Sequence, residues 1–194
     1  MRYEFTEVLN DLIDYFLLGD IRLLQKFKQE NGLSDDLASE FVSNYSADRA
    51  VESGIIIPLA GIENYPYTII FNLAHDTPEL LRPESRLQHR CAGYLLQVEN
   101  QQILLFTWRI LQNFTDKEIG LLQEHYCQAN LPRIEIENGL YDVEILGGEV
   151  LRGEYYEPAF EFVFRKTERA QMTSEVDINP VSYTHLTLPT ILLV

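Results

Sequence analysis

The 194-residue chain contains little cysteine, a single tryptophan and half as many basic as acidic residues. Two cysteines, Cys91 and Cys127, are too few for a disulfide framework, which predicts a reducing compartment, the cytoplasm. Fifteen Lys and Arg against thirty Asp and Glu give a formal net charge of −15. Such a balance argues against binding to nucleic acids, which need a basic surface, and against binding to anionic membranes.

Long apolar runs, a secretion signal and nucleotide-binding motifs are also absent from the sequence. No stretch approaches the roughly 18–20 apolar residues of a membrane span, and the chain start lacks the basic and apolar regions of a signal peptide. The glycines match neither a dinucleotide-binding fingerprint nor a phosphate-binding loop. A hydrophobic content of 46% is that of an ordinary globular protein, so we expect one domain with its own core.

The last fourteen residues, Val181–Val194, match a reading frame of a sequencing adapter. Residues 181–190 can be translated from the fixed bases of a transposase adapter, and the next three codons would then be its variable index. We therefore expect three parts: a single α+β domain at 1–165, a polar truncated tail at 166–180 and an artefactual segment at 181–194. The artefactual segment is excluded from the prediction of the fold.

The first third of the domain is predicted to be helical. Apolar residues from Phe5 to Leu17 follow helical spacing. Asp20 is expected to cap a second helix that stops at Asn31-Gly32, and Gly54 to end a fourth. Ser34 is expected to cap a third helix, which would point three residues inward: Leu37, Phe41 and Val42.

After Gly54 the pattern changes to the alternation of strands. Thr115-Asp-Lys-Glu118 is a capping box that predicts one helix over Asp116–Cys127. Asn138-Gly139 between two alternating runs predicts a hairpin with a type I′ turn, and Gly147-Gly148 a further turn. The expected fold is α+β, with an N-terminal helical segment and a mostly antiparallel β-sheet of six or seven strands containing one inserted helix. The other predicted strands are Ile55–Ile57, Tyr67–Phe71, Ala92–Val98 and Ile103–Trp108, the last two forming a hairpin, and Ala159–Phe164.

The acidic stripe around the predicted Asn-Gly hairpin is the leading candidate for a binding site. Period-two alternation places its carboxylates on the face opposite the apolar residues. Like charges opposite each other destabilise a sheet, a cost that a basic partner would offset, although a solvated outer face would show the same pattern. Trp108 is a candidate anchor, because tryptophan is favoured at binding hot spots. The candidate partner-binding residues are Glu135, Glu137, Asp142, Glu144, Glu161 and Trp108.

No set of residues indicates catalysis, a cofactor or a metal site. His89-Arg-Cys91 and His125-Tyr-Cys127 are ligand types for zinc, but their spacing matches no common zinc pattern. His75 lies in the predicted His75–Gln88 loop, where a His-Asp dipeptide is a weak signal. We therefore expect neither a metal nor a cofactor.

The second half of the chain resembles small acidic immunity proteins of bacterial polymorphic-toxin systems. The resemblance rests on size, acidity, the Asn138–Gly148 segment and the Pro158–Phe164 segment, and it covers Ile103–Arg165. It names no particular family and transfers no site residues. It implies a protein that neutralises a toxin domain by binding it.

The leading hypothesis is a non-catalytic protein that uses its acidic sheet face to neutralise a basic protein partner, such as a toxin domain. A second hypothesis is a small-molecule-binding or enzymatic domain with a pocket between sheet and helices and the His75–Gln88 loop as its lid. A histidine inside an enclosed pocket (His75, His89 or His125) would favour it. The third is an accessory module of a longer protein.

Overall fold

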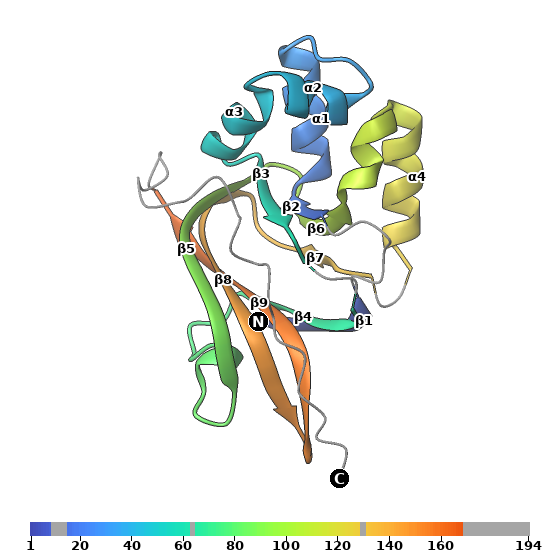
Figure 1. Cartoon of the computed structure of the whole chain (residues 1–194). Coiled ribbons are helices and arrows are strands. Elements are labelled where there is room, and N and C mark those ends of the chain that lie inside the picture. The colour runs from blue at the N-terminus through green and yellow to red at the C-terminus, as the bar shows by residue number, and fades with distance from the viewer. Residues whose placement is uncertain (9–14, 63–64, 129–130, 169–194) are drawn as a thin grey trace.

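The computed structural model describes residues 1–8, 15–62, 65–128 and 131–168, and Figure 1 shows its layers. Helices lie over one face of a four-stranded sheet, whose other face packs on a five-stranded sheet. The α+β class is confirmed, although helices also occur in the middle of the chain. The adapter-like segment and most of the predicted polar tail lie outside the described residues.

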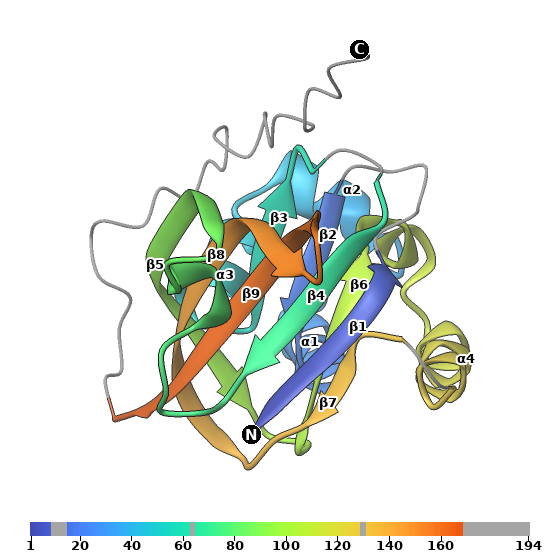
Figure 2. The same ribbon diagram turned by 90° about the horizontal axis from the view of Figure 1, so that it is seen from below.

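The five-stranded sheet contains both ends of the described chain. Figure 2 shows β1, β4 and β9 side by side in it. Neighbouring strands are antiparallel except β4 and β9, which run parallel. The strand order is β1 (Arg2–Val8), β4 (Tyr67–Asn72), β9 (Tyr155–Thr167), β8 (Gly139–Arg152) and β5 (Arg86–Val98).

The four-stranded sheet is antiparallel and lies between the five-stranded sheet and the helical layer. A short 3-10 helix, η1 (Glu79–Leu81), covers the opposite outer face of the molecule. The strand order is β3 (Ile56–Ala60), β2 (Tyr15–Gly19), β6 (Gln102–Thr107) and β7 (Arg133–Glu135). The helical layer contains α1 (Ile21–Glu30), α2 (Leu37–Ser43), α3 (Ser46–Glu52), the 3-10 helix η2 (Trp108–Asn113) and α4 (Asp116–Tyr126).

The strand alternation divides the core into three apolar clusters. In β2, Leu18 points between the two sheets while Leu17 points into the helical layer, and both are fully buried. In β9, Phe162 points between the sheets, whereas Val163 points to the outer face beneath η1. The four-stranded sheet is therefore buried on both faces.

Burial on both faces explains why the prediction of an N-terminal helix is wrong. The described parts of the Phe5–Leu17 run are strands β1 and β2; residues 9–14 lie outside the described residues. Because β2 is apolar on both faces, its Tyr-Phe-Leu-Leu sequence lacks the alternation that distinguishes a strand from a helix.

The two predicted hairpins are also wrong, because in each case the chain crosses from one sheet to the other. β5 pairs with β8 while β6 pairs with β2 and β7, so Glu99–Gln102 joins two sheets. Asn138 lacks the positive φ of a type I′ turn, and its side chain instead accepts from the Gln101 N–H at 2.8 Å. Gly139 has a φ of 153° and begins β8.

Gly147-Gly148 lies inside β8 instead of forming a turn. A Cβ at Gly148 would lie 2.2 Å from the carbonyl oxygen of Arg86, so glycine permits the close approach of β5. The turn between β8 and β9 is at Gly153, with a φ of 64°.

The helix caps follow the sequence more closely. Asp20 caps α1, Thr115 accepts from the Glu118 N–H at the start of α4, and Gly54 has a φ of 69°. The cap of α2 is Asp36 instead of Ser34: its carboxylate accepts from the Ser39 N–H at 3.0 Å.

The Asp20 carboxylate connects the helical layer to the turn between β5 and β6. It is fully buried and accepts from the N–H groups of Arg22 and Leu23 in α1. It also accepts from the N–H groups of Glu99 and Asn100, at 3.0 and 2.8 Å, and from the Asn100 side chain.

The substitution Asp20→Ala is expected to lower the free energy of unfolding by about 3 kcal/mol, because it removes a helix cap and leaves buried N–H groups without an acceptor. Urea unfolding measures this loss. The control Asp48→Ala removes an exposed carboxylate and should cost no more than about 0.5 kcal/mol. Equal losses in the two variants would contradict the role assigned to Asp20.

Candidate functional site

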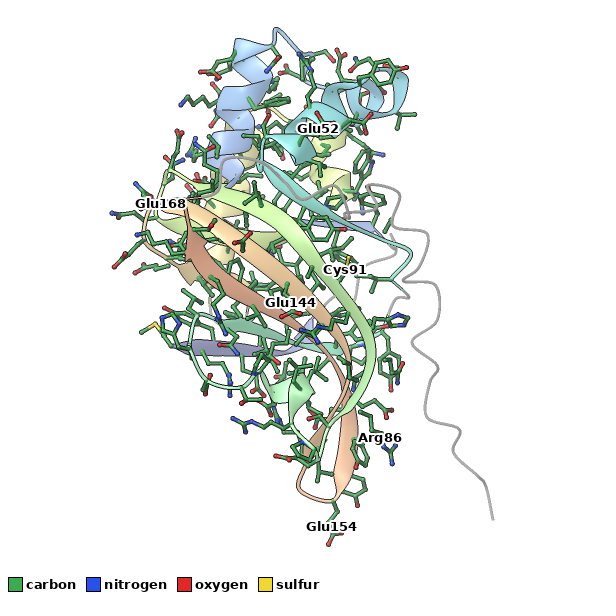
Figure 3. The ribbon with its side chains drawn as sticks, turned by 90° about the vertical axis from the view of Figure 1, so that its left-hand side faces the viewer. Glu52, Arg86, Cys91, Glu144, Glu154 and Glu168 are labelled. Carbon is green, nitrogen blue, oxygen red and sulfur yellow. The ribbon has the colours of Figure 1, made fainter. Side chains whose placement is uncertain are left out.

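Asp142 and Glu144 lie together on the outer face of β8, as the sequence predicts. They line an open groove of about 530 Å³ with Pro78, Leu81 and Arg165, and Figure 3 shows Glu144 on this face. Glu144 accepts from Arg90 Nε at 2.6 Å, and Asp142 stands opposite Arg165 in the pairing of β8 with β9. Arginines from the neighbouring strands therefore offset this acidic pair.

Glu135 and Glu137 lie on a different part of the molecule. Glu135 ends β7 in the four-stranded sheet, and both residues line a second open groove, of about 440 Å³, with Arg133 and Gln101. Glu137 pairs with Lys166 at 3.0 Å; this hydrogen bond and the carboxylate charge raise the pKa of Lys166. The acidic residues that a hairpin would have placed side by side are thus separated: Glu135 is in the four-stranded sheet, Glu137 in the chain between the sheets, and Asp142 and Glu144 in the five-stranded sheet.

Glu161 points to the outer face of the five-stranded sheet but is fully buried. One carboxylate oxygen accepts from Asn72 Nδ2 at 2.7 Å, and the other accepts from the Leu80 N–H at 2.9 Å. Its role in the structure is to hold η1 over the sheet, and its carboxylate is not on the partner-accessible surface.

Trp108 begins η2 and lies at the edge of the helical layer. Its ring contacts Tyr15 edge-on, with centroids 4.8 Å apart, and Phe41 at 6.1 Å. The half-buried ring lines an open groove of about 560 Å³ between α2 and η2. The other lining residues are Asp36, Ala38, Ser39, Val42, Ser43 and Gln112.

Two exposed apolar residues lie on and just after α2. Val42 is 80% exposed and Tyr45 is 81% exposed, while Leu37 and Phe41 are buried. The prediction that Val42 points inward is therefore wrong. In a helix, residues four apart share a face, so Val42 lies above Ala38 in the wall of the groove.

The same segment contains carboxylates without cationic partners. From Ser34 to Ser53 the sequence has five acidic residues and one arginine. Lys28 pairs with Asp35, but among the described residues the other four acids form no ion pair: Asp36, Glu40, Asp48 and Glu52. Figure 3 shows Glu52 in the helical layer, far from Glu154 at the β8–β9 turn.

Local hydrogen bonds keep two of these carboxylates charged. The Ser39 hydroxyl, and then its N–H, lower the pKa of the Asp36 carboxyl. The Ser34 N–H is the main cause that lowers the pKa of Glu40. Asp36 and Glu40 therefore stay charged to a lower pH than ordinary carboxyl groups do.

Among the described residues, the histidines and cysteines form no cluster that could hold a metal ion. Within the described part of the chain, no group of three or more His, Cys, Asp or Glu could hold a metal ion. His75 and His125 are exposed, His89 is half-buried, and none of them lines the three grooves described above. No helix of the described residues has the length and apolar character needed to cross a membrane.

No family model matches the chain, and no curated protein matches it in sequence. Among solved structures, it is similar to a protein described as crocagin biosynthetic gene J. The identity is 11%, the TM-score is 0.40, and the match covers 87% of this chain and 99% of that one. A likeness of this size carries no argument about function.

The surface of α2 and α3 is the candidate region that the sequence analysis did not identify. Its signal was present in the charge distribution, because Ser34–Ser53 has five acids and one base. The orientation of Val42 could not be read from a seven-residue helix, where one turn of periodicity fits more than one inward face.

Substituting Glu161→Ala should release η1 from the sheet. The substitution leaves the Asn72 amide and the Leu80 N–H without their acceptor, at a cost of about 2 kcal/mol. Hydrogen exchange at the Leu80 amide is expected to accelerate more than exchange in β8. The control is Glu144→Ala, which removes a pair with a largely exposed arginine and should cost about 1 kcal/mol or less. Unchanged protection at Leu80 would contradict the role of Glu161.

Proposed function

We propose that the chain is a non-catalytic acidic binding protein that covers a basic protein partner, with a bacterial toxin domain as the first candidate. The observation that carries the proposal is the combination of exposed Val42 and Tyr45 with carboxylates on α2 and α3 that form no ion pair with a described residue. We define the α2–α3 surface as Asp36–Glu52 together with Trp108 and Gln112 of η2.

The apolar part of this surface supports a protein partner. Interface cores are enriched in aromatic residues, and hot spots are anchored by tryptophan, tyrosine and arginine inside a polar rim. Val42, Tyr45 and the half-buried Trp108 would form such a core. The grooves are open to solvent, which favours a macromolecular partner over an enclosed metabolite.

The charge of the surface supports a basic partner. Unpaired carboxylates attract cations without first breaking an internal ion pair, and a net charge of −15 steers a basic protein toward the molecule. Glu135, Glu137, Asp142 and Glu144 would add to this long-range field. Three observations favour the α2–α3 surface over the sheet face for the contact itself: Glu137 and Glu144 are paired, and Glu161 is buried.

The compartment that we propose is the cytoplasm. Cys91 and Cys127 are free thiols in the structure, in keeping with a reducing environment. An immunity protein acting there would meet its toxin in the same compartment.

The proposal is tested by isolating the partner and measuring its association with charge variants. The double variant Asp48→Asn, Glu52→Gln is expected to slow association with the purified partner about threefold at low salt, because it weakens electrostatic steering. At about 1 M salt, where the Debye length is about 3 Å, the difference should disappear. Stopped-flow kinetics across this salt range is the measurement.

The matched control is Glu84→Gln, Glu154→Gln, which removes the same charge from exposed positions outside the α2–α3 surface. It should change the association rate less than the first variant does. A partner without a basic surface, or the same rate for both double variants, would rule out the proposed contact.

A further inference from the structure

The groove between α2 and η2 is lined by apolar and by polar side chains. The apolar ones are Ala38, Val42 and Trp108. The polar ones carry oxygens that can accept hydrogen bonds, and they are Asp36, Ser39, Ser43 and Gln112. An occupant that matches both parts would have an apolar stem and a head that donates several hydrogen bonds.

An arginine side chain has this chemistry. Its stem packs on apolar surface while the charged head stays near polar groups. The planar guanidinium has five donors and stacks on aromatic rings, and tryptophan is the best ring for a cation. Lysine offers a point charge with three donors and does not stack in the same way.

The local charge favours a cationic occupant. Asp36 is exposed, forms no ion pair with a described residue, and keeps its charge because Ser39 donates to it. A carboxylate has about four lone-pair sites, so two bonds from Ser39 leave capacity for a guanidinium. The nearby Glu40 is also unpaired by any described cation.

We propose that the α2–η2 groove is the recognition site for an arginine side chain of the basic partner. The guanidinium lies against Trp108 and donates to the carboxylate of Asp36, and the arginine stem covers Ala38 and Val42. This inference rests on the proposed function, since it names the group on the partner that the α2–α3 surface binds.

Trp108 is the only tryptophan of the chain, so intrinsic fluorescence reports on this groove directly. The probes are three blocked tripeptides that differ in their central residue: arginine, lysine or citrulline, the uncharged counterpart of arginine. We expect a saturable change in Trp108 emission with the arginine peptide. Binding should be about tenfold weaker with citrulline, and lysine should fall between the two.

Asp36→Asn is the sharpest variant, because asparagine caps a helix as well as aspartate does but has no charge. This substitution should weaken binding of the arginine peptide by at least about threefold. The matched control Glu84→Gln removes the same charge from an exposed position outside the α2–α3 surface and should change the affinity by less than about twofold. Far-UV circular dichroism and the emission of the free protein establish that both variants are folded.

No saturable change with the arginine peptide, equal binding of citrulline, or tighter binding of lysine would each overturn the assignment. So would equal effects of Asp36→Asn and Glu84→Gln. These failures are distinguishable from failure of the proposed function. If a basic partner binds the protein but the peptides do not, only the assignment of the groove is wrong. Arginine binding without any basic protein partner would remove the proposed function.

Discussion

The position of the helical layer depends on hydrogen bonds to one buried carboxylate. Asp20 follows β2 directly and accepts from the first turn of α1 and from the chain that leaves β5. A buried charge is stable only when such donors surround it, so the end of β2, the start of α1 and the β5–β6 turn are held in one arrangement. The Lys28 ammonium then pairs with Asp35 and donates to the Phe114 carbonyl, which ties the segment before α2 to the end of η2. The hydrogen bonds of Asp20 and Lys28 therefore fix the relative positions of the elements that form the α2–η2 groove.

Basic side chains are scarce in this chain, and their positions explain which acidic surface is available to bind a partner. Fifteen basic residues cannot pair thirty acids, and several arginines form ion pairs on the outer face of the five-stranded sheet. There Arg152 pairs with Glu4 and Glu79, and Arg90 with Glu144. These pairs hold strands and η1 together, so the carboxylates in them are not free to meet a partner without a cost in stability. Among the described residues, Asp48 and Glu52 of α3 form no such ion pair, and Asp36 and Glu40 accept only local hydrogen bonds at α2.

Sequence signals that act over a few residues predicted the ends of the helices well. The pairing of the strands depends on contacts between distant parts of the chain and was not predicted. Asp20, Thr115 and Gly54 act within a few residues of themselves, so the ends of the helices could be predicted. The two sheets could not be predicted, because the Asn138-Gly139 signal for a hairpin was outweighed by pairing of β7 with β6 and of β8 with β5. The strand β2 was read as helix because burial on both faces removes its alternation.

The candidate site was predicted only in part, for the same reason. Alternation along β8 correctly placed Asp142 and Glu144 on one face, but it carried no information on Arg90 and Arg165, which come from other strands. Trp108 was named as a candidate from its residue type, and this stays a prediction, whereas Val42 was wrongly assigned to the core. A short helix needs only one apolar edge to pack on the core, and in α2 this edge consists of Leu37 and Phe41. Val42 is thus not required by the fold, and its side chain, which is 80% exposed, lines the α2–η2 groove together with Trp108.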